Sequence, residues 1–357
     1  MMSKRLQSLD VVRGMTVAGM ILVNNGYRGS FQALRHAEWN GLSLSDLVFP
    51  FFLFIMGVSI YLSFSGKGFR PDSTTIVKVL KRTLLLFVIG IAINWLEKAS
   101  AGVVSLQELR FWAVLQRIAI CYLCVSIFAL VSKHRHTLTL AILLLTVYAV
   151  IIIAGNGYSL DRSDNIIHLA DSRIFGDAHL YHKSPVDPEG LLSTLPAIAN
   201  VLFGFYCGMK VKDSSSLQGK SSDVFTIGAI LTFAGFIVNF ALPYNKHIWS
   251  PSFSLVTSGF CALLLALMMR TIDEKGKDGL WKDCFMVFGT NALILYITSE
   301  IIAIILGRIG FSAMLFNACS LLIPVSQLAS LCYALIYVAI NFAIGFPLWR
   351  KRIFIKL

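Results

Sequence analysis

The residues best suited to chemistry lie in a polar stretch between the first two hydrophobic runs, from Val23 to Pro50. His36 lies within this stretch, Asn24 lies near the outer end of the first run, and Asp46 opens the second. Histidine can accept and return a proton near neutral pH, so it can serve as a general base. A lone loop histidine is more often simply solvated, and an asparagine at a helix end is often a cap or an interhelical donor. The stretch alone therefore marks these residues only as candidates.

A second group of polar residues lies within or beside the hydrophobic runs. Gln116 and Arg117 lie about two turns into the run 110–132. An arginine in lipid is unfavourable unless it faces a cavity or a carboxylate, and Asp187 or Glu189 is the expected partner. A structural salt bridge and a substrate contact are equally open for Arg117.

Two further pairs share a helix face. Asp10 and Arg13 are three positions apart at the start of the first run, where they could form an ion pair or receive an anionic ligand. Asn291 and Glu300 lie on one face of the run 284–306, with Glu300 toward its outer end.

The sequence gives little support for a metal site or a nucleotide motif. His179 and His182 are close in a loop but have no cysteine partners, so we expect no metal. Cys121 and Cys124 form C-x-x-C inside an apolar run and are better interpreted as small buried hydrophobes. No P-loop, Rossmann glycine pattern, H-E-x-x-H or G-x-S-x-G occurs in a convincing context.

The elements that must position these residues are membrane helices. Of the 357 residues, 56% are hydrophobic and only 14% are charged, and the mean hydropathy is +0.73, far from a soluble globular balance. Runs of roughly 18–25 apolar residues can cross about 30 Å of hydrocarbon, where they must be helical. The predicted fold is an all-α, polytopic membrane bundle forming a single domain over 1–357. About ten transmembrane helices are expected, at 8–27, 43–64, 76–97, 110–132, 137–154, 191–209, 224–242, 253–271, 284–306 and 327–349, with a short re-entrant or interfacial piece at 311–323.

The placement of lysine and arginine predicts the orientation of this bundle. Most of the 31 Lys and Arg residues fall in alternate connections, which places both termini in the cytoplasm and the loop with His36 outside. The longest connection, 155–190, is then extracytoplasmic, and the Ser/Gly-rich segment 213–223 is a cytoplasmic linker. The net charge of +12 reflects this uneven placement of lysine and arginine. Because the basic residues are scattered over short loops, they do not form a patch that would bind nucleic acid. The first run lacks a small-residue cleavage site, so we expect a retained helix.

Taken together, these segments resemble the heparan-alpha-glucosaminide N-acetyltransferase family, the transmembrane acetyltransferases of lysosomes and their bacterial relatives. The resemblance covers the chain from end to end. Its most specific part is the pattern H-A-x-W-N-G-L-x-x-x-D-L-V-F-P-x-F, which begins at His36. The matching stretches are RLQSLDVVRGMTVAGMILVNN, RHAEWNGLSLSDLVFPFFLFIMGVSIYLS, VLQRIAICYL, DSRIFGDAHLYH with VDPEGLLST, GTNALILY and LWRKRIFIKL.

The resemblance implies acetyl transfer across a membrane, from cytoplasmic acetyl-CoA as co-substrate to the amine of a glucosamine-type sugar on the other side. His36 matches the family's catalytic histidine and Asn24 the asparagine beside it, where an oxyanion could be stabilised. Whether the histidine is transiently acetylated or acts as a base stays open, since imidazole can do both. Asp46 joins this catalytic group. The residues expected to bind acetyl-CoA are Arg13, Arg82 and Asn291, and those expected to contact the acceptor are Arg117, His179, Asp187, Glu189 and Glu300.

The chain also departs from the family pattern. Human-type members carry a large luminal domain before the first matching helix, whereas this sequence begins with that helix, so we expect a bacterial homologue whose acceptor need not be heparan sulfate. The spacing from Asn24 to His36 is one residue longer than expected, which makes Asn25 a rival for the asparagine role. Ser299, next to Glu300, stands where a histidine is expected.

The leading prediction is a multi-pass N-acetyltransferase of the bacterial inner membrane that acts at the periplasmic face. Its expected partners are an amino sugar or glycan and the lipid bilayer, and a homodimer is compatible with this interpretation. An amino-sugar transporter or permease is the alternative, because a helix bundle with a polar pathway suits a carrier equally well. A membrane protein that only supports a partner complex is the third interpretation. A carrier should move sugar without CoA and need no proton-transferring histidine.

Overall fold

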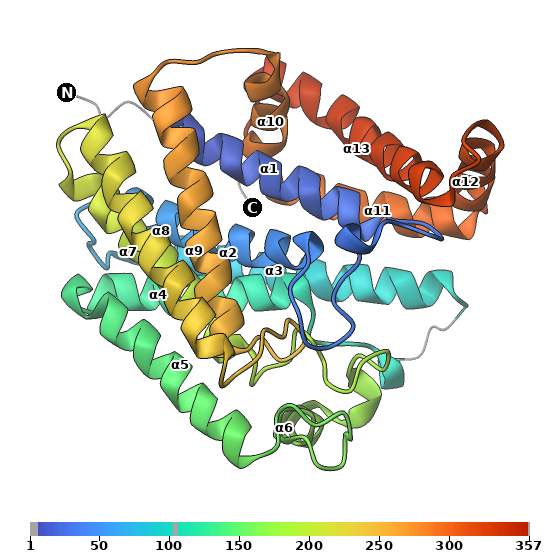
Figure 1. Cartoon of the computed structure of the whole chain (residues 1–357), viewed down its shortest axis with the longest axis horizontal. Coiled ribbons are helices and arrows are strands. Elements are labelled where there is room, and N and C mark those ends of the chain that lie inside the picture. The colour runs from blue at the N-terminus through green and yellow to red at the C-terminus, as the bar shows by residue number, and fades with distance from the viewer. Residues whose placement is uncertain (1–5, 103–105, 356–357) are drawn as a thin grey trace.

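The chain folds into a bundle of helices that cross one another at varied angles (Figure 1). The computed structural model describes residues 6–102 and 106–355, and the regular secondary structure in those ranges is helical. The α-helices are α1 Gln7–Asn24, α2 Leu44–Ser65, α3 Ser73–Ser100, α4 Val114–Val131, α5 Thr137–Ala154, α6 Ile166–Phe175, α7 Thr194–Asp213, α8 Leu217–Asn239, α9 Pro251–Met268, α10 Leu280–Thr290, α11 Ala292–Arg308, α12 Phe311–Leu322 and α13 Ser326–Arg350.

The helices confirm the predicted all-α, multi-pass class. Each of the ten predicted runs is helical over most of its length. Within the described ranges, seven helical stretches are long and apolar enough to cross a membrane, and α10 with α11 would make an eighth if the pair forms one span. The helices α1 and α3 are not among them, so the count of ten stays a prediction, as does the orientation of the termini. The seven stretches are Leu44–Ser65, Val114–Val131, His134–Ala154, Thr194–Asp213, Leu217–Asn239, Pro251–Glu274 and Ser326–Arg350.

The predicted run 284–306 differs from the structure, because it is broken into α10 and α11, which meet at an angle of 80°. Asn291 lies at the break and holds the end of the chain there. Its Nδ2 donates to the carbonyl of Ile353 at 3.0 Å, and its Oδ1 accepts from the backbone N–H of Ile355 at 2.9 Å. A side chain that satisfies a second backbone segment stabilises the break, which helix periodicity alone does not reveal.

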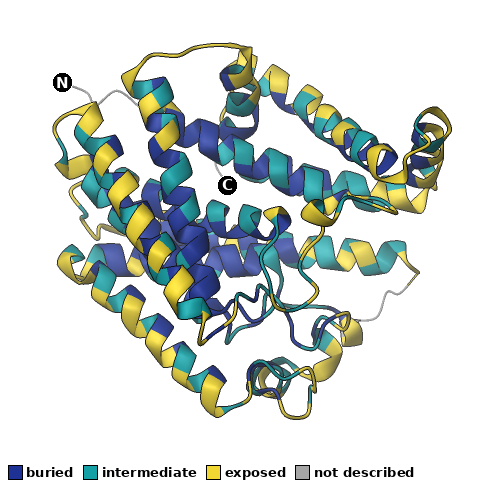
Figure 2. Cartoon of the chain, viewed as in Figure 1, coloured by how far each residue is buried: buried dark blue, intermediate teal, exposed yellow. Residues whose placement is uncertain are grey.

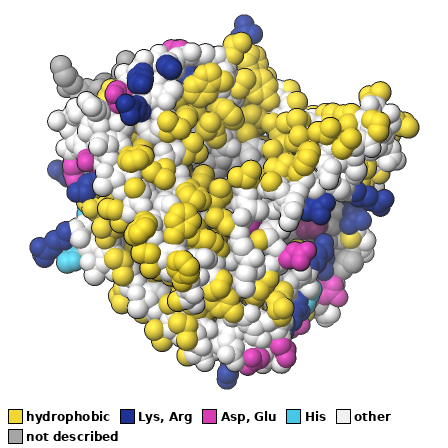
Figure 3. Space-filling model, viewed as in Figure 1, with side chains coloured by type: hydrophobic (Ala, Val, Ile, Leu, Met, Phe, Trp, Pro, Cys, Tyr) yellow, Lys and Arg dark blue, Asp and Glu magenta, His cyan; other side chains and the backbone are white. Residues whose placement is uncertain are grey.

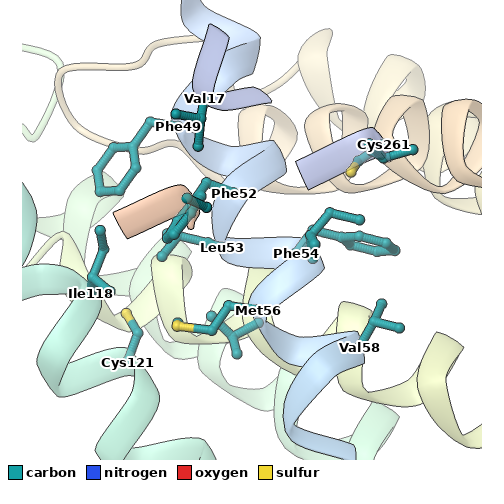
Figure 4. Packing of buried hydrophobic residues seen from close by; sticks show 14 of the residues in the cluster. Val17, Phe49, Phe52, Leu53, Phe54, Met56, Val58, Ile118, Cys121 and Cys261 are labelled. Carbon is teal, nitrogen blue, oxygen red and sulfur yellow. The ribbon is translucent and has the colours of Figure 1, made fainter. Parts of the chain in front are cut away.

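The buried centre of the bundle is formed by α2 and its neighbours. The pairs α2 with α7, α8 with α9 and α1 with α10 make the most extensive contacts, and burial is extensive along α2, α7 and α9 (Figure 2). The side chains of Phe52, Leu53 and Phe54 on α2 lie between Ile118 of α4 and Cys261 of α9 (Figure 4). Side chains in such a core interdigitate at close to crystal density, so α2 is fixed on several sides.

The outer surface is largely apolar. Broad fields of hydrophobic side chains cover the viewed face, and charged side chains gather toward its edges (Figure 3). Large exposed hydrophobic residues recur on α3, α5 and α8, for example Leu84, Ile142 and Phe233. An apolar exterior of this extent is what a lipid environment favours and what a soluble monomer avoids.

Two glycines allow α2 and α7 to approach each other closely. A Cβ atom on Gly204 of α7 would lie 1.9 Å from the carbonyl oxygen of Phe54 on α2. A Cβ on Gly57 of α2 would likewise lie 1.9 Å from the carbonyl oxygen of Val201 on α7. Small residues that let backbones approach are typical of helix packing in membranes. The position of α2, and of the polar residues at its first turn, depends on this contact.

We therefore expect Gly204→Ala to destabilise the protein, because the new methyl group must displace backbone rather than a flexible side chain. Overpacking of this kind costs about 1–3 kcal/mol or more. Thermal unfolding in detergent measures the change. Gly307→Ala is the matched control, since no atom outside the local helix backbone would lie within 4 Å of the added methyl group, and helix propensity favours alanine there. Equal midpoints for Gly204→Ala and wild type would contradict this account of the α2–α7 contact.

Candidate active site

The first turn of α2 holds His36 through a buried carboxylate. His36 Nδ1 lies 2.8 Å from Asp46 Oδ1; the Asp46 side chain is fully buried, while the His36 side chain keeps 41% of its surface exposed. Ser43 caps α2 in a capping box, and its backbone N–H and hydroxyl donate to Asp46 Oδ2 at 3.0 and 2.9 Å. A serine at the N-cap with an acid three residues later produces this arrangement locally. Asp46 is therefore held in place independently of His36.

This pairing assigns different roles to the two ring nitrogens of His36. An ionised carboxylate only accepts hydrogen bonds, so the neutral imidazole presents Nδ1–H to Asp46 and leaves a lone pair on Nε2. Nε2 is then the atom that can take a proton or attack a carbonyl carbon. The structure thus brings together two of the three residues predicted to be catalytic.

Lys246, in the connection between α8 and α9, lies against the His36 ring. Its Nζ is 3.0 Å from Nδ1 and 3.1 Å from Nε2 of His36, and 3.8 Å from Asp46 Oδ1. With Nδ1 protonated toward Asp46, the ring nitrogen that can still accept a hydrogen bond from this amine is Nε2. Lys246 therefore contacts the ring nitrogen that Asp46 does not hold. Burial lowers the pKa of Lys246, and the negative charges of Asp46 and Glu189 oppose that lowering.

The connection that carries Lys246 is tied to the segment after His36. The backbone N–H of Gly41 donates to the carbonyl of Tyr244 at 2.7 Å, and Asn245 Nδ2 donates to Asn40 Oδ1 at 3.1 Å. Lys246 was not among the predicted site residues, because it is far from His36 along the chain. The signal available was the short run Y-N-K-H-I-W-S, which places an amide, a cation, an imidazole and a tryptophan between two helices.

His247 joins three segments beside the site. Its Nε2 lies 3.2 Å from the carbonyl oxygen of Ala37, and its Nδ1 lies 2.9 Å from Ser184 Oγ in the connection 155–190. The ring packs against Trp39, with centroids 5.5 Å apart. Burial lowers the pKa of His247, so the neutral form that these contacts suit is favoured.

Asn24 does not share the contacts of His36 but pairs with α11. Its Nδ2 donates to Glu300 Oε1 at 3.1 Å. The rival residue Asn25 is buried, and its Nδ2 donates to the carbonyl of Ile21 within the same helix, at 2.8 Å. The geometry therefore gives Asn25 a capping contact and leaves the exposed Asn24 as the asparagine that reaches another helix. The catalytic assignment of Asn24 stays a prediction.

The predicted partner of Arg117 is wrong, because Asp187 and Glu189 pair with Arg110 instead. Arg110 Nη2 lies 2.7 Å from Glu189 Oε2, and Arg110 also contacts both carboxylate oxygens of Asp187. Arg110 lies just before α4, where it reaches the connection 155–190 more directly than Arg117 does. The positive charges of Arg110 and Arg117 lower the pKa of Glu189 against the raising effect of burial.

Arg117 is fully buried and held by neutral groups. Its Nη2 donates to the carbonyl of Gly190 at 2.9 Å and to the hydroxyl of Ser193. Its guanidinium lies over the ring of Trp249, 4.9 Å from the centroid, a contact that favours a cation. Neither Nε nor Nη1 has a hydrogen-bond partner among the described residues. Arg117 therefore combines a structural role with donors that remain unused.

A cavity of about 540 Å³ lies between α3, α4 and α11. Arg110 and Glu300 line it together with Tyr296, so two of the polar contacts described above border one space. Gln116 also lines it, and neither polar atom of this fully buried amide has a partner within the described part of the chain. An unpaired buried amide is costly, which makes Gln116 a strong candidate for binding a polar ligand. In the sequence, Gln116 stood out only as the neighbour of Arg117.

The three residues predicted to bind acetyl-CoA have separate surroundings. Arg13 pairs with Asp10 at 2.8 Å, as expected for an i,i+3 ion pair, and donates to Ser59 at 2.7 Å. Arg82 lies over the ring of Tyr122, 4.5 Å from the centroid, and Asn291 binds the end of the chain as described above. Their cofactor role stays a prediction.

His179, predicted to contact the acceptor, is anchored to the segment before α4. Its Nδ1 lies 2.7 Å from the carbonyl oxygen of Leu109, and its ring packs on Phe111 with centroids 4.4 Å apart. These contacts fix the end of the connection 155–190 beside Arg110. The role of His179 toward an acceptor stays a prediction.

Asp171 of α6 supports the segment that binds Arg117. It is fully buried, and its Oδ1 accepts from the backbone N–H groups of Leu191 and Leu192 at 3.0 and 3.2 Å. Its Oδ2 has no hydrogen-bond partner among the described residues and faces Gly190, where a Cβ would come within 1.8 Å. Burial raises the pKa of Asp171 to about 7.

Comparison with known proteins identifies similar sequences. The family model described as heparan-alpha-glucosaminide N-acetyltransferase, catalytic, matches residues 5–236. The chain is 28% identical to the heparan-alpha-glucosaminide N-acetyltransferase of Homo sapiens over 83% of its own length and 53% of that protein. It is also 28% identical to the protein of the same name from Mus musculus, over 84% of this chain and 54% of the mouse protein. The chain thus spans about half the length of these relatives.

The raised pKa of Asp171 predicts a pH dependence of stability. The folded state binds the proton more tightly than the unfolded state, so the free energy of unfolding should fall as pH rises from about 4 to about 7. The contribution is on the order of 2–4 kcal/mol. Asp171→Asn should remove this fall, because the amide cannot ionise.

Thermal unfolding of detergent-solubilised wild type and Asp171→Asn at pH 5 and pH 8 measures this effect. Asp164→Asn is the matched control, since Asp164 is exposed and contacts only Asn156 by side-chain hydrogen bonds among the described residues. It should keep the wild-type slope. Parallel pH profiles for wild type and Asp171→Asn would show that Asp171 does not govern this dependence.

Proposed function

Because this chain belongs to the heparan-alpha-glucosaminide N-acetyltransferase catalytic family, we propose that it is a membrane-embedded N-acetyltransferase. It takes the acetyl group of acetyl-CoA and transfers it to the amine of a glucosamine-type sugar. The activity for which the human and mouse relatives are named supports this reaction class. The apolar helices support its location in a membrane, which we propose to be the inner membrane of a bacterium.

The single observation that carries the proposal is the pairing of an exposed His36 with the buried Asp46 at 2.8 Å. A thioester carbonyl needs either a nucleophile or a base that deprotonates the attacking amine, and Nε2 of His36 suits both roles. Asp46 holds the ring through Nδ1, which leaves Nε2 to react. The carboxylate also stabilises the positive charge that forms when Nε2 takes a proton or an acetyl group, as an orienting carboxylate does in other acyl transfers.

The acceptor is proposed to occupy the cavity between α3, α4 and α11. Glu300 can attract the ammonium of an amino sugar, and the unpaired amide of Gln116 can bind its hydroxyl groups. The Arg110–Glu189 pair connects this cavity with the His36 site, because Glu189 also attracts Lys246. Asp187, Arg117 and His179 support this wall through the contacts described above.

The donor is proposed to approach from the cytoplasmic side, with the sugar on the periplasmic side. Arg13 and Arg82 lie toward the predicted cytoplasmic ends of α1 and α3, and guanidinium groups bind phosphates well. Asn291 lies at the predicted cytoplasmic end of α11. In this arrangement CoA phosphates stay on one side while the acetyl group reaches His36 on the other.

We predict that wild-type protein in sealed liposomes transfers a labelled acetyl group from acetyl-CoA on one side to glucosamine on the other. His36→Gln should lower this transfer by about 10²-fold or more, because the base or nucleophile is lost. His182→Gln, an exposed histidine that contacts Arg162, is the matched control and should keep wild-type transfer. Mass spectrometry of N-acetylglucosamine measures the product.

Three outcomes would contradict the proposal in whole or in part. Full transfer by His36→Gln would remove the catalytic role of this histidine. Accumulation of unmodified sugar in the vesicles without CoA, with no acetylated product, would show a carrier instead. Transfer only when donor and acceptor share one side would retain the enzyme and overturn the proposed sidedness.

A further inference from the structure

Lys246 is placed more rigidly than a charge on a surface loop would require. Trp249, three residues on, is fully buried and has φ +52°, a left-handed conformation that is strained for a bulky residue. Its indole N–H donates to Asn200 Oδ1 at 2.8 Å, and its ring packs edge-on against Phe49 and Phe253. Strain that the surroundings maintain at one position points to a geometric requirement nearby.

The turn itself closes on Lys246. The backbone N–H of Trp249 donates to the carbonyl of Lys246 at 3.1 Å. Asn245 Oδ1 accepts from the N–H of Ile248 at 3.1 Å, and Ser250 Oγ accepts from the N–H of Asn245 at 3.1 Å. The Lys246 side chain is only 13% exposed. Its ammonium is therefore preorganised beside His36, which is the condition for electrostatic catalysis without reorganisation.

We propose that Lys246 is a catalytic residue whose ammonium stabilises the oxyanion formed when the acetyl carbonyl is attacked beside His36. This inference rests on the proposed function. It assigns to Lys246 the stabilisation of the oxyanion, a role that the sequence analysis predicted for Asn24. The Asn24 amide donates to Glu300, whereas the Lys246 amine lies 3.1 Å from Nε2 of His36 and beside two carboxylates that oppose the effect of burial on its pKa.

Both routes open for His36 need such a charge. In the covalent route, Nε2 bonds to the thioester carbon and the C=O π pair moves onto oxygen; the C=O then re-forms, the C–S bond breaks and CoA leaves as the thiolate. The amine next adds to the carbonyl carbon of the acetyl-imidazole, forming a second oxyanion. The C=O then re-forms, the C–Nε2 bond breaks with its electron pair returning to Nε2, and Nε2 takes the proton that the amine loses. In the direct route, the amine bonds to the thioester carbon while Nε2 takes its proton, and the same C–S bond breaks.

The ammonium is close enough to act in these adducts. A carbonyl oxygen on a group bonded to Nε2 lies two bonds from that nitrogen, so an ammonium 3.1 Å from Nε2 is within hydrogen-bond reach of it. Burial lowers the pKa of Lys246, and the negative charges of Asp46 and Glu189 oppose that lowering. Asp46 keeps a further contact with Ser43, so it remains in place as charge develops.

The test compares wild type with Lys246→Met in detergent. One assay measures the kinetics of transfer from acetyl-CoA to glucosamine. The other measures binding of a trifluoromethyl ketone analogue of acetyl-CoA, which forms a stable tetrahedral adduct. We expect kcat to fall about 10²–10³-fold, with KM for acetyl-CoA nearly unchanged. The affinity for the ketone should fall by a similar factor, while the affinity for CoA itself stays constant. Lys246→Arg should recover part of both losses.

The controls separate this role from a structural one. Lys183→Met, an exposed lysine of the connection 155–190, should behave as wild type. Thermal unfolding reports whether Lys246→Met folds; if it does not, the comparison of Lys246→Gln with Lys246→Arg gives the same contrast of neutral and charged side chains. Wild-type kcat and ketone affinity in the neutral variant would overturn the inference. A wild type that binds CoA but transfers no acetyl group overturns the proposed function, and the inference with it.

Discussion

The outer site depends on one buried carboxylate, Asp46, at the first turn of α2. The capping box satisfies one of its oxygens through Ser43, and the other oxygen meets His36. A buried charge is tolerated only when it is paired and hydrogen-bonded. The same contacts that end the helix properly therefore also orient the imidazole, and Lys246 supplies the nearby positive charge.

The position of this carboxylate is set by helix packing. The glycine contacts between α2 and α7 fix the axis of α2, and the large side chains of its middle turns lock it against α4 and α9. The connection with Lys246 is held from a different direction, through Trp249 and Asn200. The exposed His36 ring thus lies between two rigid supports, and a loop residue acquires the precision that catalysis by proton or acetyl transfer requires.

Much of the fold was predictable because apolar run length is a local property. The helices lie close to the predicted runs, and His36 with Asp46 could be selected from one short stretch. The bend at Asn291 could not be predicted from the sequence, since it depends on a contact with Ile353 and Ile355. The sequence predicted Arg117 as the partner of Asp187, but the structure pairs Asp187 with Arg110, which lies just before α4. Lys246 contacts His36 although 210 positions of sequence separate them. Such contacts belong to the tertiary structure, which periodicity does not describe.

Catalysis by His36 requires that Asp46 hold Nδ1 and leave Nε2 unprotonated. Nitrogen-15 NMR of imidazole-labelled protein in nanodiscs measures this most directly, with His36→Gln used to assign the His36 signals. We expect a neutral ring protonated at Nδ1, with an Nε2 shift typical of an unprotonated nitrogen, and a tautomer mixture in Asp46→Asn. A ring protonated at Nε2 in wild type, or an unchanged spectrum in Asp46→Asn, would contradict it.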